Sequence, residues 1–409
     1  MSKKQTVIIS SVSDCREKNG IVTFMQILAR NSAHFASHGM MLAFSNYVDF
    51  SLNDKQTESK NKPHIINKQA TVARVKIITR IKRKVRGPIS RHPFLAFLLF
   101  LLTLGARGLV TAFKARKYDE PGCVHFYQDF LTASFGYFLH HKTARNILIL
   151  HSSADSLKHF FIHFSGMVGT RYEKFVRHWF DWTLRNQQCI VTLSEGYAKE
   201  LRERYPNKEI KCIYNTSPFT GSRIVASTAN GAAQRIRLVA IGSLQYIKGF
   251  DLLIKAIASI PKTVREKLEV TIVGGGPDYA ELAELIVFHQ LGGVITLAGE
   301  SNDVASFLAV SDAYILTSRD EGLPISLIEA CSFGLPIIST AVGSIPELFD
   351  DSSCAFMEPS EISIADTLMS LCSGRLDLEH LSSQSLQIFD SKLSLEKFLF
   401  SYVDLLGRK

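Results

Sequence analysis

The sequence lacks the marks of a secreted or zinc-binding protein. Its seven cysteines are odd in number, are scattered and form no C-x-x-C pair, so neither a disulfide framework nor a zinc site is expected. The apolar run within the opening residues MSKKQTVIIS is too short for a secretory signal. These absences predict a protein of the reducing cytoplasm.

Acidic residues are missing from one long segment. Residues 61–117 hold fourteen Lys or Arg and no Asp or Glu, so the whole chain's net charge of +9 less these fourteen charges leaves −5 for the rest. The basicity is therefore local. It predicts a surface-specific partner rather than general affinity for nucleic acid.

The same segment contains a run of thirteen uncharged residues, Phe94 to Ala106, which ends at Arg107. As a helix this run would be roughly 20 Å long at ~1.5 Å per residue, which is short of the ~30 Å hydrocarbon core of a bilayer, so we expect no membrane span. With the basic residues before it, the stretch 74–107 predicts an interfacial element on anionic lipid, peripheral on the inner face of the plasma membrane. The alternative is a buried helix that follows a solvated basic helix.

The length of 409 residues predicts two domains, and a hydrophobic content of 46% with 21% charged residues is typical of globular proteins. Apolar runs alternate with helical patterns throughout, which predicts parallel sheets with right-handed crossovers. We expect an N-terminal domain over 1–216, a Ser/Thr/Gly/Ala-rich linker over 217–234 and a second α/β domain over 235–385. The helical tail 386–409 could pack back on the first domain.

The stretch from Ser318 to Gly343 carries most of the predicted chemistry. It follows an apolar run typical of a buried strand and enters a helix with Pro324 expected in its first turn. The start of a helix offers free N–H groups that suit phosphate. Glu321 and Glu329 beside such a site would need a ligand rich in hydroxyls, such as a sugar or ribose, and the alternative is that both are solvated charges.

Other candidate residues follow predicted strands, where open α/β sheets place their ligand groups. His151 comes directly after the strand 146–150, and Gly20 lies in the first strand–helix loop. Lys248 lies in the loop 242–249 and could bind phosphate as a point charge. Each has an ordinary alternative, namely a structural histidine, a turn glycine and a solvated lysine.

Together these pieces resemble retaining glycosyltransferases of the GT-B fold, and specifically glycosyltransferase family 4. The motifs GSLQYIKGFDLLIKA, LEVTIVGGGPD and EGLPISLIEA carry the resemblance over 237–359, and HFYQDF, ILHSS, VTLSEGYAKEL and IYN match loosely in the first half. The resemblance implies two Rossmann-like, doubly wound parallel-sheet domains that face across a cleft. Residues 61–117 have no counterpart in the family.

The resemblance also implies site roles. The co-substrate would be a UDP- or GDP-linked sugar, with no other cofactor and no metal, consistent with the lack of an Asp-x-Asp clamp. Glu321 would bind the donor sugar and Glu329 the ribose. Lys248 would stabilise the leaving diphosphate, together with the backbone N–H groups of Gly322, Leu323 and Ile325.

Four positions complete the expected site. His151 and Gly20 would approach the reacting centre from the first domain. Ser243 stands where the family usually has Arg, and one hydroxyl does not replace a bidentate guanidinium at a phosphate. Our hypothesis is that Arg319 supplies the missing cation, and the alternative is that Arg319 forms a surface ion pair.

The favoured function is the transfer of one sugar, with retention, to a lipid-linked (polyprenyl) or membrane-proximal glycan in the assembly of a surface polysaccharide such as capsule, lipopolysaccharide O-antigen or exopolysaccharide. Two alternatives stay open. One is a sugar-nucleotide epimerase or hydrolase on a related fold. The other is a non-catalytic subunit that binds sugar nucleotides, to which Ser243 would point.

Overall fold

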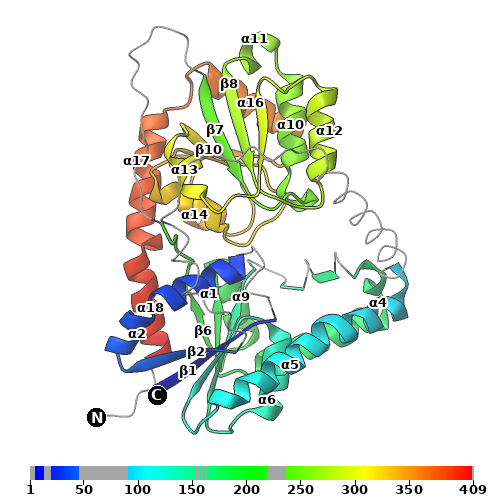
Figure 1. The fold of residues 1–409 in the computed structure, drawn as a ribbon, viewed down its shortest axis with the longest axis vertical. Helices are drawn as coiled ribbons and strands as arrows, with labels where there is room; N and C mark the ends of the chain where they lie inside the picture. The colour runs from blue at the N-terminus through cyan, green and yellow to red at the C-terminus, as the bar shows by residue number, and fades with distance from the viewer. Residues whose placement is uncertain are drawn as a thin grey trace, which may run out of the picture. The chain divides into compact units, whose positions relative to one another are not determined.

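The computed structural model describes residues 5–12, 20–45, 91–152, 156–157, 160–161, 164–219 and 235–407. The chain divides into two compact units, Met1–Ile213 with Leu399–Lys409 (unit 1) and Tyr214–Phe398 (unit 2) (Figure 1). Each unit contains a six-stranded sheet in which every strand pair is parallel. The predicted fold class of two doubly wound α/β domains is confirmed.

The sheet of unit 1 has the strand order β2-β1-β3-β4-β5-β6. The chain moves outward from β1 to β2 and then returns to β3 on the other side of β1, so the strand order reverses next to β1. The bounds are β1 (Gln5–Ser10), β2 (Met40–Phe44), β3 (Val124–Tyr127), β4 (Arg145–Leu150), β5 (Cys189–Thr192) and β6 (Glu209–Cys212).

Polar side chains fix where the helices of unit 1 begin. Asp129 caps the helix that follows β3, with its carboxylate accepting from the Thr132 N–H at 2.8 Å and from the Val12 N–H at 2.9 Å. One side chain therefore starts a helix and holds the loop after β1. The helices and turns are α1 (Gly20–Arg30), α2 (Ser32–Ser37), α4 (Pro93–Phe100), η2 (Leu101–Gly105), α5 (Ala106–Ala115), η3 (Arg116–Tyr118), α6 (Phe130–Leu139), η4 (Ser165–Met167), α8 (Arg171–Arg185) and α9 (Glu195–Arg204).

The end of the chain completes unit 1. Helix α18 (Leu395–Gly407) places the fully buried ring of Tyr402 edge-on to Phe24 of α1 and near Phe126 of β3, with ring centroids 5.5 and 5.6 Å away. Arg145 donates from Nη1 to the Leu405 carbonyl at 2.6 Å. Truncation of this helix would therefore open the core of unit 1.

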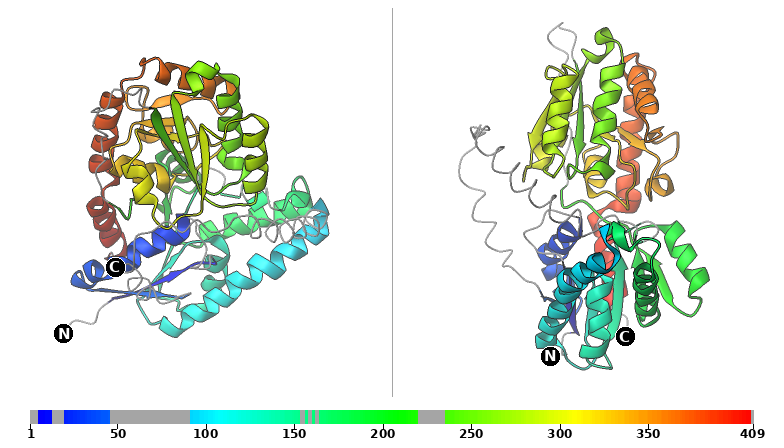
Figure 2. Two further views of the ribbon diagram at one scale, coloured as in Figure 1. Left: turned by 45° about the horizontal axis from the view of Figure 1, so that its top comes forward. Right: turned by 90° about the vertical axis from the view of Figure 1, so that its right-hand side faces the viewer.

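The apolar segment forms a longer helix than the sequence predicts. From α4 through η3 the chain is helical without a break over Pro93–Tyr118, 26 residues (Figures 1 and 2). At ~1.5 Å per residue it is roughly 39 Å long, so by length and composition it could cross a membrane. The expectation of a thirteen-residue helix ending at Arg107 is wrong, because arginine is a good helix former and does not terminate one.

The sheet of unit 2 has the strand order β12-β11-β10-β7-β8-β9, which reverses between β7 and β10. The strands are β7 (Ile236–Ile241), β8 (Leu268–Val273), β9 (Ile295–Gly299), β10 (Ala313–Leu316), β11 (Ile337–Thr340) and β12 (Ala355–Met357). The helices and turns are η5 (Tyr246–Lys248), α10 (Phe250–Ser259), α11 (Lys262–Arg265), α12 (Tyr279–Phe288), α13 (Val304–Ala309), α14 (Ile325–Ser332), α15 (Ile345–Leu348), α16 (Glu361–Cys372), α17 (Leu378–Ile388) and η6 (Phe389–Leu393).

The structure corrects the expected position of Pro324 and does not describe two of the predicted stretches. Pro324 has φ −66° and ψ 126°, so it is the residue that precedes α14 rather than part of its first turn. Most of the expected linker, residues 220–234, and the basic stretch 61–90 lie outside the described residues.

Candidate functional site

The candidate site lies at the carboxyl ends of β7 and β10, where the strand order of unit 2 reverses. Open α/β sheets bind their ligands at such a point. The loops after these strands approach each other closely. Gly249 has φ +65°, and a Cβ built on it would come 1.9 Å from the Thr317 carbonyl oxygen. Only glycine fits there, so the loop that carries Lys248 is held against the end of β10.

Lys248 and Glu321 form an ion pair across these two loops. Lys248 Nζ lies 2.6 Å from Glu321 Oε1 and 2.8 Å from Oε2. Ser318 Oγ also donates to Glu321 Oε1, at 2.7 Å. The carboxylate is 7% exposed and the lysine side chain 25%, so the ammonium is the more accessible of the two charges. The structure thus shows how an acid can be held beside an anion site.

The loop between β10 and α14 presents free backbone donors. Among the described residues, the N–H groups of Gly322, Leu323 and Ile325 donate no hydrogen bond. The Gly322 carbonyl accepts from the Ser344 N–H at 3.1 Å, which anchors the loop to the turn after β11. Unpaired N–H groups at a helix start, where the helix dipole is positive, are suited to an anionic oxygen.

Glu329 lies one turn into α14. It is 7% exposed, and its carboxylate has no hydrogen-bond partner among the described residues. Burial raises the pKa of Glu329 from its ordinary value near 4.5 to about 7. A buried carboxyl without a partner is costly, so the side chain is prepared for a ligand that brings hydrogen-bond donors.

Arg319 is engaged elsewhere in this structure. Its guanidinium binds Asp251 through both terminal nitrogens, with Nη1 2.7 Å from Oδ1 and Nη2 2.8 Å from Oδ2. It also lies over the Tyr246 ring, 3.9 Å from the centroid. The geometry is that of the ion-pair alternative, and Arg319 would have to leave Asp251 to reach a diphosphate. Ser243 lies half-buried in the loop after β7, so a hydroxyl stands there in place of a cation.

In unit 1, His151 follows β4 and lies 2.9 Å, through Nε2, from Oε1 of Gln128, which follows the neighbouring strand β3. Its ring packs edge-on to Phe24, with centroids 5.5 Å apart. Burial lowers the pKa of His151 to about 4, so the imidazole is neutral near pH 7. Gly20 is the first residue of α1.

Sequence reasoning missed two of these partners, Gln128 and Ser318. Each follows the end of a strand, Gln128 directly after β3 and Ser318 two residues after the end of β10. Gln128 follows β3 beside the strand that precedes His151, and Ser318 is three residues before Glu321. Their position at strand ends was the available signal. Strand order was needed to know that the Gln128 amide meets the imidazole.

A separate titratable group lies at the start of β3. Oxygen, sulfur and nitrogen atoms of Asp119, Cys123 and His125 lie within 4.8 Å of one another, the geometry of a potential cation site. Each atom is already hydrogen bonded within the group, at 3.0 to 3.5 Å. Burial raises the pKa of Cys123 to about 11 and lowers that of His125 to about 4, so both are neutral near pH 7. We infer that these three side chains have a structural role, fixing the start of β3.

The chain is similar in sequence to known glycosyltransferases. Residues 228–386 match the family model for glycosyl transferases group 1. N-acetyl-alpha-D-glucosaminyl L-malate synthase of Bacillus anthracis is 26% identical over 183 residues, 42% of this chain and 47% of the relative. The lipopolysaccharide core biosynthesis glycosyltransferase LpsE of Rhizobium meliloti is 29% identical over 160 residues, 38% of this chain and 45% of the relative.

Among solved structures, HepE of Anabaena in complex with UDP and glucose superposes with a TM-score of 0.67 at 15% identity, covering 99% of this chain and 100% of that chain. The two sheets and this superposition place the chain in the GT-B fold class. The match to the family model for glycosyl transferases group 1 lies within unit 2 and covers less than half of the chain. The match spans less than half the length of both curated relatives.

Proposed function

We propose that the protein is a metal-independent, retaining glycosyltransferase that moves a sugar from a UDP- or GDP-linked donor to a hydroxyl of a lipid-linked or membrane-proximal glycan during assembly of a surface polysaccharide. The observation that carries this proposal is the Lys248–Glu321 pair beside the unpaired N–H groups that precede α14. A lysine, free amides and one buried acid in these loops, with a second buried acid one turn into α14, match the charges and hydroxyls of a nucleotide sugar.

The chemistry follows from where charge develops. When the bond from the sugar's anomeric carbon to the diphosphate breaks, negative charge builds on the leaving oxygens. Lys248 and the N–H groups of Gly322, Leu323 and Ile325 stabilise that charge, which is the role that a metal ion would otherwise fill. When the lysine turns to the diphosphate, the Glu321 carboxylate, which also accepts from Ser318, can accept hydrogen bonds from the sugar.

His151 serves in this proposal as a neutral hydrogen-bond partner of the donor sugar. Gln128 lies within hydrogen-bond distance of Nε2, which restrains the ring, and a neutral imidazole adds no positive charge where the leaving diphosphate already has its cation. Gly20 is the first residue of α1, and the N–H groups in the first turn of a helix have no acceptor within the helix.

One assay separates the proposal from its alternatives. The protein is incubated with UDP- and GDP-sugars, with and without membrane extract, and nucleotide release is followed in the presence of a chelator. A transferase releases nucleotide only when the acceptor is present, and the product's anomeric configuration, read by NMR, matches that of the donor. Release without extract indicates a hydrolase, and loss of donor without release indicates an epimerase. Binding without turnover indicates a non-catalytic subunit, and loss of release in chelator contradicts metal independence.

Glu329 predicts a pH dependence of donor binding. Its carboxylate must be ionised to accept two ribose hydroxyls, so the donor KM should fall about tenfold between pH 6 and pH 8, as expected for a group whose pKa is about 7. His151, with a pKa near 4, contributes no inflection in this range. In Glu329→Gln the profile should be flat, whereas Glu266→Gln, a change of an exposed acid on the surface of unit 2, should keep the native profile. A native profile in Glu329→Gln would contradict the assignment.

Glu329 also predicts that the protein becomes less stable as pH rises, while donor binding improves. Between pH 4.5 and 7 the folded chain keeps a proton on Glu329 that the unfolded chain has released, so the free energy of unfolding falls as pH rises. The two pKa values correspond to roughly 3 kcal/mol at most. Glu329→Gln should therefore be more stable than the native protein at pH 8, measured by denaturant unfolding, and equal stability at pH 8 would show that the carboxyl is not buried in solution.

The acceptor part of the proposal includes peripheral attachment to the inner face of the plasma membrane through 74–107. Of this range, residues 74–90 lie outside the described residues. Neutralising Arg80 to Arg86 should weaken binding to anionic liposomes, because each basic residue near the surface contributes about 1 kcal/mol. Unchanged binding would contradict attachment through this stretch.

A further inference from the structure

One face of the helix Pro93–Tyr118 packs against the rest of unit 1. Ala96, Phe100, Ala112 and Ala115 are fully buried along it. Gly108 lies so close to α6 that a Cβ built on it would come 2.8 Å from Leu131 Cβ. A helix packed this tightly on its own domain cannot cross a bilayer by itself, because crossing would expose that core face and break the contact with α6.

The opposite face is apolar and exposed. Phe94, Leu98, Leu102, Leu109 and Phe113 are 51, 38, 67, 45 and 63% exposed. Their spacing of four, four, seven and four residues places them along one side of the helix. We name these five side chains the apolar stripe. Five exposed apolar side chains along one side of a helix mark an interaction site rather than scattered surface residues.

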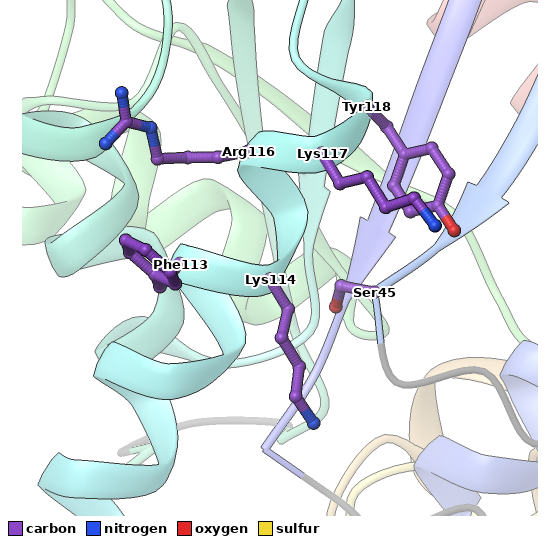
Figure 3. Close-up of a pocket in the computed structure, with 6 residues that line it drawn as sticks. All are labelled: Ser45, Phe113, Lys114, Arg116, Lys117 and Tyr118. Atoms are coloured by element: carbon purple, nitrogen blue, oxygen red, sulfur yellow. The ribbon is translucent and has the colours of Figure 1, made fainter.

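A basic pocket lies at the C-terminal end of the same helix. It has a volume of about 490 Å³ and is lined by Ser45, Phe113, Lys114, Arg116, Lys117 and Tyr118 (Figure 3). Because Phe113 belongs to both, the pocket continues the apolar stripe.

The cations of this pocket have no acid to neutralise them among the described residues. No carboxylate described in the structure lies within ion-pair distance of Lys114, Arg116 or Lys117. The acids that follow in sequence are bound elsewhere, Asp119 to His125 and Glu120 to Thr6. A helix C-terminus accounts for one favourable cation through its dipole. Three cations within four residues, next to an apolar face, are suited to a partner surface that is both anionic and apolar.

We propose that unit 1 lies on an anionic membrane through this helix, with the apolar stripe in the interfacial layer and a lipid phosphate bound by Lys114 and Lys117 in the pocket. A helix that lies flat keeps its buried face on the domain while its other face enters the headgroup region. This inference rests on the proposed function and deepens it. The phosphate or diphosphate that links a lipid to its glycan is the group the pocket would hold.

The test is flotation of the full-length protein with vesicles of neutral lipid alone or with about one third anionic lipid, a composition that carries the negative surface potential the pocket requires. Lys114→Ala with Lys117→Ala should weaken binding to the anionic vesicles by roughly 30-fold, at about 1 kcal/mol per lysine, and leave binding to neutral vesicles unchanged. Leu102→Ser with Phe113→Ser should weaken binding to both. Two matched controls lie outside this helix. Lys262→Ala removes a charge, and Phe400→Ser removes an apolar side chain that is 73% exposed. Both should bind vesicles like the native protein.

Several results would overturn the inference. Native binding by both double variants would do so. So would a loss of binding on neutralising Arg80 to Arg86 while Lys114→Ala with Lys117→Ala changes nothing, since attachment would then bypass the pocket. Binding of inorganic diphosphate by the pocket without any vesicle binding would show a soluble ligand instead. Because vesicle binding requires no sugar transfer, normal flotation without transfer contradicts the proposed transferase activity and leaves this inference standing. Normal transfer without flotation contradicts this inference and attachment through 74–107, and leaves the proposed transferase activity standing.

Discussion

Lys248→Ala and Glu321→Ala are each expected to lower kcat by about 10² to 10³, the effect of removing one group that stabilises a developing oxyanion or its partner. The two side chains are joined at 2.6 and 2.8 Å, so removing either one breaks this ion pair. In Lys248→Ala the leaving diphosphate loses its only nearby ammonium among the described residues of this loop. In Glu321→Ala the lysine is retained but the sugar loses its acceptor of hydrogen bonds.

The readout for this first prediction is kcat and donor KM measured separately, together with thermal unfolding to show that the fold is intact. Lys262→Ala is the matched control, because Lys262 is an exposed lysine of the same unit whose one ion-pair partner among the described residues is Glu266 at the surface. Its activity should equal that of the native protein. Native turnover in either site variant would remove Lys248 or Glu321 from the mechanism.

Gly249→Ala is expected to destabilise unit 2 and abolish donor binding. The residue has φ +65°, and its new Cβ would come 1.9 Å from the Thr317 carbonyl oxygen, so the main chain must move. Clash and backbone strain together should cost about 3 kcal/mol or more, which corresponds to a fall in Tm of roughly 10 °C for a unit of this size. The displaced loop carries Lys248, so activity should fall with stability.

Gly374→Ala separates the two causes of this second prediction. Gly374 has a similar φ of +73°, but nothing lies within 4 Å of a Cβ built there. It therefore bears the left-handed backbone cost alone, about 1 kcal/mol, and a fall in Tm of roughly 3 °C. Equal losses in the two variants would show that close approach to Thr317 plays no part.

Much of the site follows from the sequence because its residues stand at strand ends. The apolar runs before His151, Ser243 and Glu321 predicted buried strands, and the structure places all three directly or a few residues after one. The pairing of Lys248 with Glu321 could not be predicted in the same way. The two residues are 73 positions apart and meet because β7 and β10 are neighbours, and strand order is set by the packing of the whole sheet.

Arg319 shows where side-chain reasoning from sequence ends. A cation two residues before Glu321 is a reasonable substitute for the arginine replaced by Ser243. Its guanidinium instead binds Asp251, which is 68 positions away in the sequence. Asp251 comes near only because α10 packs beside the loop after β10. The helix Pro93–Tyr118 shows the converse case. Its exposed stripe has helical spacing in the sequence, but its length was underestimated because Arg107 was taken as a terminus.

The central claim is that a leaving diphosphate binds Lys248 and the free amides before α14. The most direct measurement is a crystal structure with UDP, and a second with GDP, bound to the native protein. We expect the terminal phosphate within hydrogen-bond distance of Lys248 Nζ and of the N–H groups of Leu323 or Ile325, with the ribose hydroxyls on Glu329. A nucleotide bound with its phosphates away from Lys248 and its ribose away from Glu329 would contradict the account.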